Sequence, residues 1–197
     1  ILRNIKLINK NVKISYEIQD KPNGIPEAFI IGEKFLKNSK KNILILGDNF
    51  FHSNKIISEM KQSLSKNFNS KIFLYKVKDP SNFGSINFNK KKNKIESLVE
   101  KPKKPQNNFA VTGLYFFDKN VLKYFKKLKK SKRGELEITD LLNIYLKENK
   151  LKFEILGRGH TWFDLGTFEN LLNAQNFVKI IQDRQGFRVG NISKHKF

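Results

Sequence analysis

Apolar residues fall in short runs separated by turn residues along most of the chain. In the first part, three runs predict strands: 12–18 (VKISYEI), 42–47 (NILILG) and 71–77 (KIFLYKV). Between these runs, helical spacing predicts helices over 25–38, with Pro26 in a first turn, and from Ser53 to about residue 67. This alternation of strands and helices is typical of a doubly wound α/β sheet.

The later part departs from this alternation. Three further strands are predicted without long helices between them: 83–88, 94–100 and 110–117. Residues 90–93 (KKKN) predict a hairpin turn between the first two. The remaining predicted elements are helices at 119–129 and 137–149 and a helix at 168–184, whose end is marked by Gly186 and Gly190. Between them, the stretches 151–157 and 161–166 bracket a Gly-Arg-Gly turn. We therefore expect a Rossmann-like, three-layer α/β/α fold with a mixed, mostly parallel sheet and an added β-hairpin region.

Composition supports a globular protein and excludes some chemistry. The 197 residues include 18 Phe and no Cys, so we expect an aromatic core without disulfides or thiol catalysis. The absence of Cys is compatible with a cytoplasmic location, and no apolar run has the length of a membrane-spanning helix. The first residues do not have the pattern of a signal peptide.

The chain is strongly basic, with a net charge of +21 from 39 basic and 18 acidic residues. Such a charge can indicate a nucleic-acid or membrane-surface binder. Only five of the basic residues are Arg, however, and Lys is scattered through nearly every segment. This even spread favours a general bias of composition over a dedicated nucleic-acid site.

Two carboxylates follow predicted strands. Asp48 comes directly after ILILG, and Asp164 follows Trp162 and Phe163. Ligands of open α/β sheets bind at the carboxyl ends of strands, and oxygen ligands without His or Cys favour Mg²⁺. From pattern alone, the two residues are either a metal-binding pair or ordinary helix-capping residues.

Other candidate residues lie in turns and loops. In EKP, Glu100 could accept hydrogen bonds from ligand hydroxyls and Lys101 could meet a phosphate, although an exposed loop has the same pattern. In RGELEIT, Arg133 could hold a phosphate, or the acidic residues could open the following helix. Gln19 and Gly24 could meet a pyrimidine base, or they could form an ordinary turn.

Seven blocks in one order carry a resemblance to a known family: ISYEIQDKPNGIPEAFIIGE, LGDNFF, YKVKDPSNFG, EKPKKPQNNFAVTGLYFFD, RGELEIT, LGRGHTWFDLGT and NFVKIIQDRQG. Together they resemble the glucose-1-phosphate thymidylyltransferases (dTDP-glucose pyrophosphorylases) among the sugar nucleotidyltransferases, over residues 13–188. The resemblance implies transfer of a thymidylyl group from dTTP to glucose 1-phosphate, giving dTDP-glucose and pyrophosphate. Such enzymes supply precursors of dTDP-rhamnose and cell-surface polysaccharides.

The resemblance also implies roles for individual residues. It implies that Asp48 and Asp164 hold Mg²⁺, and that Lys101 and Arg133 approach the sugar phosphate as the catalytic pair. The other residues implied to bind substrate contact the base, contact the glucose or shape its pocket: Gln19, Gly24, Gly84, Glu100, Val111, Tyr115 and Trp162. The family has no protein nucleophile, so catalysis depends on positioning and charge neutralisation.

Some family features are missing. The chain has no GGxGTRL-type phosphate loop and no KQLLP-like segment, and it stops short of the family's C-terminal segment. We therefore expect residues 1–197 to be a single incomplete nucleotidyltransferase domain that is inactive alone. We expect exposed apolar edges and low stability of this chain, and a homo-oligomer when the protein is full length.

Two alternative functions stay open. A non-catalytic sugar-nucleotide binder would explain the missing phosphate loop beside Glu100, Lys101 and Arg133. A basic nucleic-acid-binding module rests on the +21 charge alone. If the chain is instead part of a thymidylyltransferase, the expected partners are dTTP and glucose 1-phosphate, with no membrane and no dedicated nucleic-acid partner.

Overall fold

The structure, a computed structural model, describes residues 12–65, 68–89, 91 and 94–190. The chain divides into two compact units: Ile18–Trp162, and Ile1–Glu17 together with Phe163–Phe197. The positions of the two units relative to one another are not determined. Each unit is therefore described by itself, and a single domain over residues 1–197 stays a prediction.

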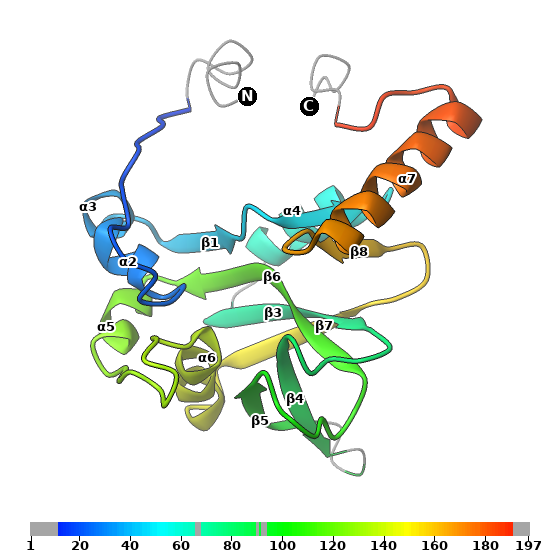
Figure 1. The fold of residues 1–197 in the computed structure, drawn as a ribbon. Helices are drawn as coiled ribbons and strands as arrows, with labels where there is room; N and C mark the ends of the chain where they lie inside the picture. The colour runs from blue at the N-terminus through cyan, green and yellow to red at the C-terminus, as the bar shows by residue number, and fades with distance from the viewer. Residues whose placement is uncertain (1–11, 66–67, 90, 92–93, 191–197) are drawn as a thin grey trace. The chain divides into compact units, whose positions relative to one another are not determined.

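The larger unit is built on a six-stranded mixed sheet (Figure 1). The strands on its main path run in the order β5-β4-β6-β3-β7, and β1 also pairs with β6. Their bounds are β1 Lys41–Ile45, β3 Ser70–Lys76, β4 Gly84–Asn89, β5 Lys94–Glu100, β6 Phe109–Asp118 and β7 Leu151–Leu156. Two short strands, β2 (Asn49–His52) and β8 (Thr161–Asp164), lie outside this sheet.

The long strand β6 determines the directions of the sheet. It pairs antiparallel with β1, β3 and β4, whereas β3 and β7 are parallel. It follows that β1, β3, β4 and β7 run in one direction, and β5 and β6 in the other. The sheet is mixed, as predicted, but its neighbouring pairs are mostly antiparallel and, among the described strands, only β3 and β7 pair in parallel, so the prediction of a mostly parallel sheet is wrong in this respect. β4 and β5 form the expected hairpin, with Gly84 opposite Glu100; the turn predicted at 90–93 lies largely outside the described residues.

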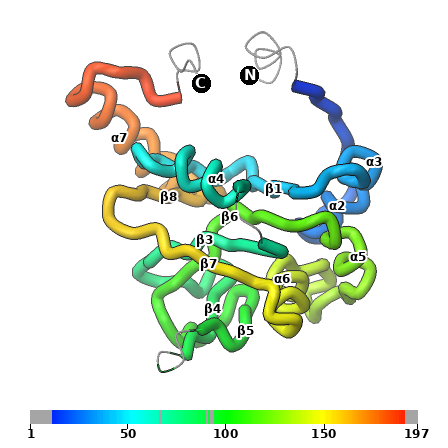
Figure 2. Tube along the Cα trace, turned by 180° about the vertical axis from the view of Figure 1, so that it is seen from behind, coloured from blue at the N-terminus to red at the C-terminus, as the bar shows by residue number. Residues whose placement is uncertain are grey.

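Side chains alternate between two cores on opposite faces of the sheet. Ile72 and Leu74 of β3 join one cluster, with Tyr115 and Phe117 of β6. Phe73 joins the other cluster, with Leu114 and Phe116 of β6. The first cluster packs against α2, α5 and α6, and the second against α4, so helices cover both faces (Figures 1 and 2). The predicted three-layer α/β/α arrangement is thereby confirmed.

The helices are shorter than the sequence pattern predicts. Their bounds in the larger unit are α2 Glu27–Ile31, α3 Glu33–Leu36, α4 Ile56–Ser65, α5 Val121–Phe125 and α6 Ile138–Lys147. The predicted helix over 25–38 is divided at Gly32, which ends α2 and begins α3. Glycine is a poor residue for a helix interior, which explains the interruption.

One predicted strand is wrong. Residues 12–18 form no strand, and Tyr16 and Ile18 are 66% and 81% exposed. Alternation of apolar and polar residues does not make a strand unless a neighbouring strand accepts its hydrogen bonds. On β1, Ile43 and Ile45 are 38% and 53% exposed.

In the smaller unit, the main described element is α7 (Phe168–Gln185). Its N-terminus is capped by Thr167, whose hydroxyl accepts from the Asn170 amide at 3.2 Å. Its C-terminus is closed by Gly186 in the left-handed conformation, with a φ of 69°. Both ends agree with the helix predicted over 168–184.

Candidate sugar-phosphate and metal site

Three strands and one helix bring a first group of candidate residues together in the larger unit. A Cβ atom added to Gly84 would lie 3.6 Å from the Glu100 Oε2 atom and 3.6 Å from the Val111 Cβ atom. It would also lie 3.0 Å from the Thr139 Cγ2 atom on α6. Glu100 and Val111 therefore both lie beside Gly84, in the space that a side chain at this position would need.

Glu100 is a partly buried acid within this group. Its side chain is 18% exposed. The Thr139 hydroxyl donates to its Oε2 atom at 3.3 Å. Burial raises the pKa of Glu100 and the neighbouring Glu137 carboxylate raises it further, whereas Thr139, Lys101 and Arg133 act in the opposite direction. An acid in this environment is suited to binding hydroxyl groups.

Arg133 lies beside Glu100 among three carboxylates. Its guanidinium nitrogens lie 3.9 Å from Glu100, 3.5 Å from Glu135 and 3.6 Å from Glu137. Its side chain remains 42% exposed, so one side of the guanidinium can meet an anion from solvent. Because these three carboxylates offset the charge of Arg133, they reduce its attraction for an anion that enters.

The loop that carries Arg133 is held by its own hydrogen bonds. The Ser131 hydroxyl donates to the Glu137 carboxylate at 2.7 Å and accepts from the Arg133 amide at 3.1 Å. Glu137 is the N-cap residue of α6, but its side chain makes no capping bond. The segment RGELEIT leads into α6, and its side chains face Arg133 and Glu100. A phosphate contact of Arg133 stays a prediction.

Lys101 has an unusual backbone conformation. Its φ is 41°, in the left-handed region that few non-glycine residues adopt. Its amide donates to the carbonyl of Phe83 at 3.1 Å, which ties the end of β5 to the start of β4. Strain of this kind persists where the surrounding structure imposes it, which is frequent at functional sites.

Gln19 and Gly24 lie in one turn that packs on the Arg133 loop. The Gln19 amide donates to Glu27 at 2.6 Å and to the Gly24 carbonyl at 3.3 Å. Gly24 has a φ of 110°, and a Cβ atom there would lie 2.1 Å from the carbonyl oxygen of Leu136. The residues predicted to meet the base are therefore joined to the loop of Arg133.

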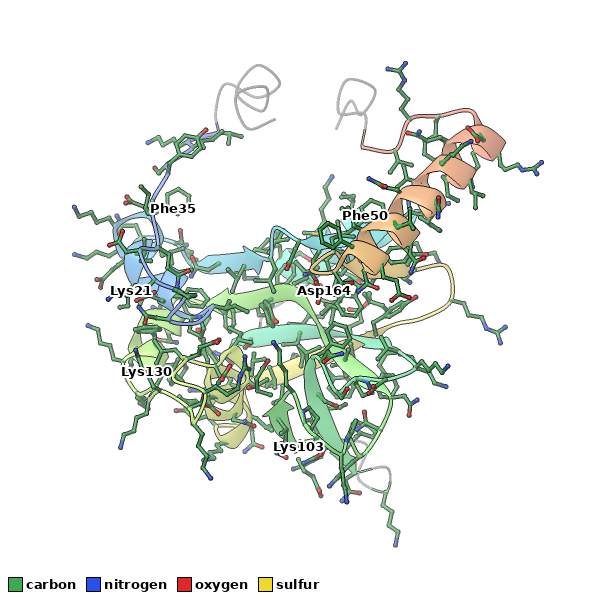
Figure 3. The ribbon with its side chains drawn as sticks, in the orientation of Figure 1. Lys21, Phe35, Phe50, Lys103, Lys130 and Asp164 are labelled. Carbon is green, nitrogen blue, oxygen red and sulfur yellow. The ribbon has the colours of Figure 1, made fainter. Side chains whose placement is uncertain are left out.

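Asp48 and Asp164 lie in different units, so the structure does not define the distance between them. Asp48 is exposed, and its Oδ1 atom accepts from the Asn49 side-chain amide at 2.9 Å. The Asp164 Oδ1 atom accepts from the Gly166 amide at 3.1 Å; Asp164 is labelled in Figure 3. Within the described residues, no group of three or more His, Cys, Asp or Glu residues could hold a metal ion. The metal pair stays a prediction.

The two aromatic candidates lie in different environments. Tyr115 belongs to the first core cluster, is 3% exposed and stacks on Phe117 at a centroid distance of 6.3 Å. Trp162 is 7% exposed and packs its ring against Tyr75 and Phe83, at 5.8 and 5.2 Å. A role in shaping a sugar pocket stays a prediction for both residues.

Sequence reasoning assigned no role to Asn49, although it lies next to Asp48 in LGDN. Its Oδ1 atom accepts from the Trp162 indole at 2.7 Å and from the Gly113 amide at 2.8 Å. These partners are distant in sequence, so no local pattern could identify them. The position beside Asp48 was the only available signal.

The described part of the chain contains no helix that is both long enough and apolar enough to cross a membrane.

Comparison with known proteins places this arrangement in context. The family model described as "Nucleotidyl transferase" matches residues 2–180. A glucose-1-phosphate thymidylyltransferase of Neisseria meningitidis is 42% identical over 178 residues, which cover 90% of this chain and 61% of that protein. The corresponding enzyme of Mycobacterium tuberculosis is 42% identical over 180 residues, with the same two coverages. The chain thus spans about three fifths of the length of these relatives.

Solved structures are similar in fold. A Bacillus anthracis protein described as a glucose-1-phosphate thymidylyltransferase, crystallised with sucrose, has a TM-score of 0.72 and 38% identity. The match covers 85% of this chain and 66% of that one. A UDP-glucose pyrophosphorylase bound to UDP-glucose has a TM-score of 0.77 at 23% identity, covering 91% of this chain and 70% of that one. At that identity, the second likeness concerns the fold alone.

Proposed function

The chain belongs to the nucleotidyl transferase family, and from that premise we propose that it forms part of a glucose-1-phosphate thymidylyltransferase. The proposed reaction joins dTTP and glucose 1-phosphate, giving dTDP-glucose and pyrophosphate for dTDP-rhamnose and cell-surface polysaccharide synthesis. The observation that carries the proposal is the convergence of Gly84, Glu100 and Val111 beside Arg133. The group offers hydroxyl-binding and phosphate-binding chemistry within one part of the larger unit.

In this proposal, the sugar is held between strands and helix α6. Glu100 accepts hydrogen bonds from glucose hydroxyls, beside Gly84 and the apolar side chain of Val111. Trp162 and Tyr115 shape the walls of the pocket.

The phosphate is held by positive charge. Arg133 exchanges contacts with its three carboxylates for contacts with the sugar phosphate, and Lys101 approaches the same group from the end of β5. A sugar phosphate oxygen then attacks the α-phosphorus of dTTP: a new P–O bond forms, and the bond to the pyrophosphate leaving group breaks. Gln19 and Gly24 hold the thymine base.

The chemistry of two carboxylates supports the proposal of a magnesium ion. Asp48 and Asp164 each offer a carboxylate with one oxygen engaged by a single N–H donor, from Asn49 and Gly166 respectively. Hard carboxylate oxygens are suited to Mg²⁺, which neutralises phosphate charge when it is bound. We propose that these two residues hold the ion, and that the whole protein is a cytoplasmic homo-oligomer with no dedicated nucleic-acid partner.

The proposal is tested in a chimaera. Residues 2–180, which the family model matches, replace the corresponding segment of the Neisseria meningitidis relative. Pyrophosphate release is measured with dTTP, glucose 1-phosphate and Mg²⁺. We expect turnover, with losses of about 100-fold or more for Asp48→Asn and Asp164→Asn.

The matched control is Glu33→Gln. Glu33 lies within residues 2–180, in α3, and its side chain is exposed. We expect this variant to keep its activity. A chimaera that binds dTDP-glucose without turnover would instead support a non-catalytic sugar-nucleotide binder, and full activity of both Asp variants would remove the metal assignment.

A further inference from the structure

Strand β6 changes its partner at Gly113. On one edge, β1 pairs with β6 as far as Leu114, opposite Ile45, and β4 begins to pair at Ala110. Both main-chain groups of Gly113 are taken by the segment that follows β1. Its carbonyl accepts from the Leu46 amide at 2.9 Å, and its amide donates to the Asn49 Oδ1 atom at 2.8 Å. Two residues of the LGDN segment, Leu46 and Asn49, are thereby hydrogen-bonded to the carbonyl and the amide of Gly113 in the sheet.

Gly113 provides the space for this attachment. A Cβ atom there would lie 2.5 Å from the Asn49 Oδ1 atom, 2.6 Å from its Cγ atom and 2.8 Å from its Nδ2 atom. These distances are far inside van der Waals contact, so any other residue would displace the Asn49 amide. The requirement for glycine is therefore steric.

The Asn49 side chain connects three groups. Its oxygen accepts from the Gly113 amide and from the Trp162 indole at 2.7 Å, and its nitrogen donates to the Asp48 Oδ1 atom at 2.9 Å. Because two N–H donors point at one amide atom, that atom must be the oxygen. The nitrogen is then directed at Asp48. The Gly113 amide and the Trp162 indole thus determine the orientation of the Asn49 amide, and with it the contact to Asp48.

The connection continues beyond Trp162. The indole ring packs on Phe83 at a centroid distance of 5.2 Å. The carbonyl of Phe83 accepts from the Lys101 amide at 3.1 Å. One chain of contacts therefore runs from the carboxylate of Asp48 to the backbone of the strained Lys101.

We propose that Asn49 is a positioning residue with two roles. Its side chain orients the Asp48 carboxylate toward a divalent cation, and it also fixes the position of the Trp162 indole. The absence of a side chain at Gly113 provides the space that Asn49 needs. The Asp48 part rests on the proposed function, since it takes Asp48 as a metal ligand. The Trp162 part stands on the contacts of the larger unit alone.

The Trp162 part is tested by NMR on the 197-residue chain. Trp162 is the only tryptophan, so selective ¹⁵N-tryptophan labelling gives one indole signal. We expect Asn49→Ala and Gly113→Ala to move that signal from its folded position. Asn49→Asp should keep it there, because a carboxylate oxygen still accepts from the indole. Gly157→Ala is the control, since a Cβ atom there meets nothing within 4 Å.

The Asp48 part is tested by the affinity for Mn²⁺, measured by EPR on the same chain in the presence of dTDP-glucose. We expect Asn49→Ala to weaken Mn²⁺ binding about 10- to 100-fold, the usual effect of losing a group that orients a metal ligand. Gly157→Ala should bind Mn²⁺ as the unsubstituted chain does.

The outcomes separate the two parts. An indole signal at the random-coil position in the unsubstituted chain, or one unmoved by Asn49→Ala, overturns the Trp162 part. Undetectable Mn²⁺ binding before substitution, or affinity unchanged by Asn49→Ala, overturns the Asp48 part. A chimaera without turnover beside the expected NMR result would count against the proposed function and leave the Asn49 contacts intact.

Discussion

Gly24 lies against the backbone of Leu136, so close that a Cβ atom would be 2.1 Å from its carbonyl oxygen and 2.7 Å from its nitrogen. The Leu136 amide also donates to the carbonyl of Asn23 at 2.7 Å. Gly24 and Leu136 are 112 residues apart in the sequence. This contact joins the turn of Gln19 to the loop of Arg133, and with it two parts of the candidate site.

Gly24→Ala should destabilise the chain by about 2 kcal/mol or more, because the φ of 110° and the clash with Leu136 both oppose a side chain. Urea denaturation of the two proteins measures the change in the free energy of unfolding. Gly47→Ala is the matched control, since its added Cβ atom meets nothing within 4 Å. Equal losses for the two variants would contradict the close contact.

Lys101→Gly should increase stability by about 1 kcal/mol, because glycine adopts a φ of 41° without the strain that a lysine carries there. The same change should lower turnover in the chimaera, since the ammonium that approaches the phosphate is lost. Thermal unfolding and pyrophosphate release measure the two effects. Lys103→Gly, at a nearby exposed position, should give no gain in stability. A less stable Lys101→Gly variant would show that the backbone is not strained.

Glu100→Gln should increase stability at neutral pH and lose this advantage in acid. Burial and Glu137 raise the pKa of Glu100 above its ordinary value of 4.5, so the folded state holds the proton more tightly than the unfolded chain. Ionised Glu100 therefore opposes folding above its folded-state pKa, and this penalty disappears as the pH falls below 4.5.

The check is the difference in the free energy of unfolding between Glu100→Gln and the unsubstituted chain, measured from pH 4 to pH 8. The difference should be largest at the upper end of this range and should narrow toward the lower end. A difference that is independent of pH, or one that widens in acid, would contradict the role of burial at Glu100. In the chimaera, the same variant should bind glucose 1-phosphate more weakly.

The sequence pattern predicted the central strands of the sheet more accurately than the helices and the N-terminal segment. Strands β3 and β5 lie within one residue of the predicted 71–77 and 94–100, because buried apolar runs bounded by turn residues carry a strong local signal. Residues 12–18 have the same alternation but form no strand. Helix α5 ends at Phe125, before the lysine-rich residues that the pattern included. A strand needs a neighbouring strand and a helix needs a surface to pack against, and a local sequence pattern contains neither.

Only some residues of the candidate site could be predicted from the sequence. The resemblance to a family supplied Gly84, Glu100 and Val111, which the structure brings together through strand register. The contacts of Asn49 with Gly113 and Trp162 could not be predicted, because they join side chain to backbone and side chain to side chain across long stretches of sequence. Such contacts follow from the fold and not from any local pattern.

The +21 charge should confer only weak, salt-sensitive binding to nucleic acid. Lysines are spread through most segments of the chain, and Lys103 lies apart from Lys21 and Lys130 in Figure 3. Binding to a duplex should therefore be detectable at low salt and fall steeply with increasing salt, because it depends on counterion release alone. Fluorescence anisotropy of a labelled duplex from 20 to 200 mM NaCl measures this dependence. Affinity that differs between duplexes of unrelated sequence, or that persists at 200 mM NaCl, would indicate a dedicated nucleic-acid site and would restore that function as the better account of the charge.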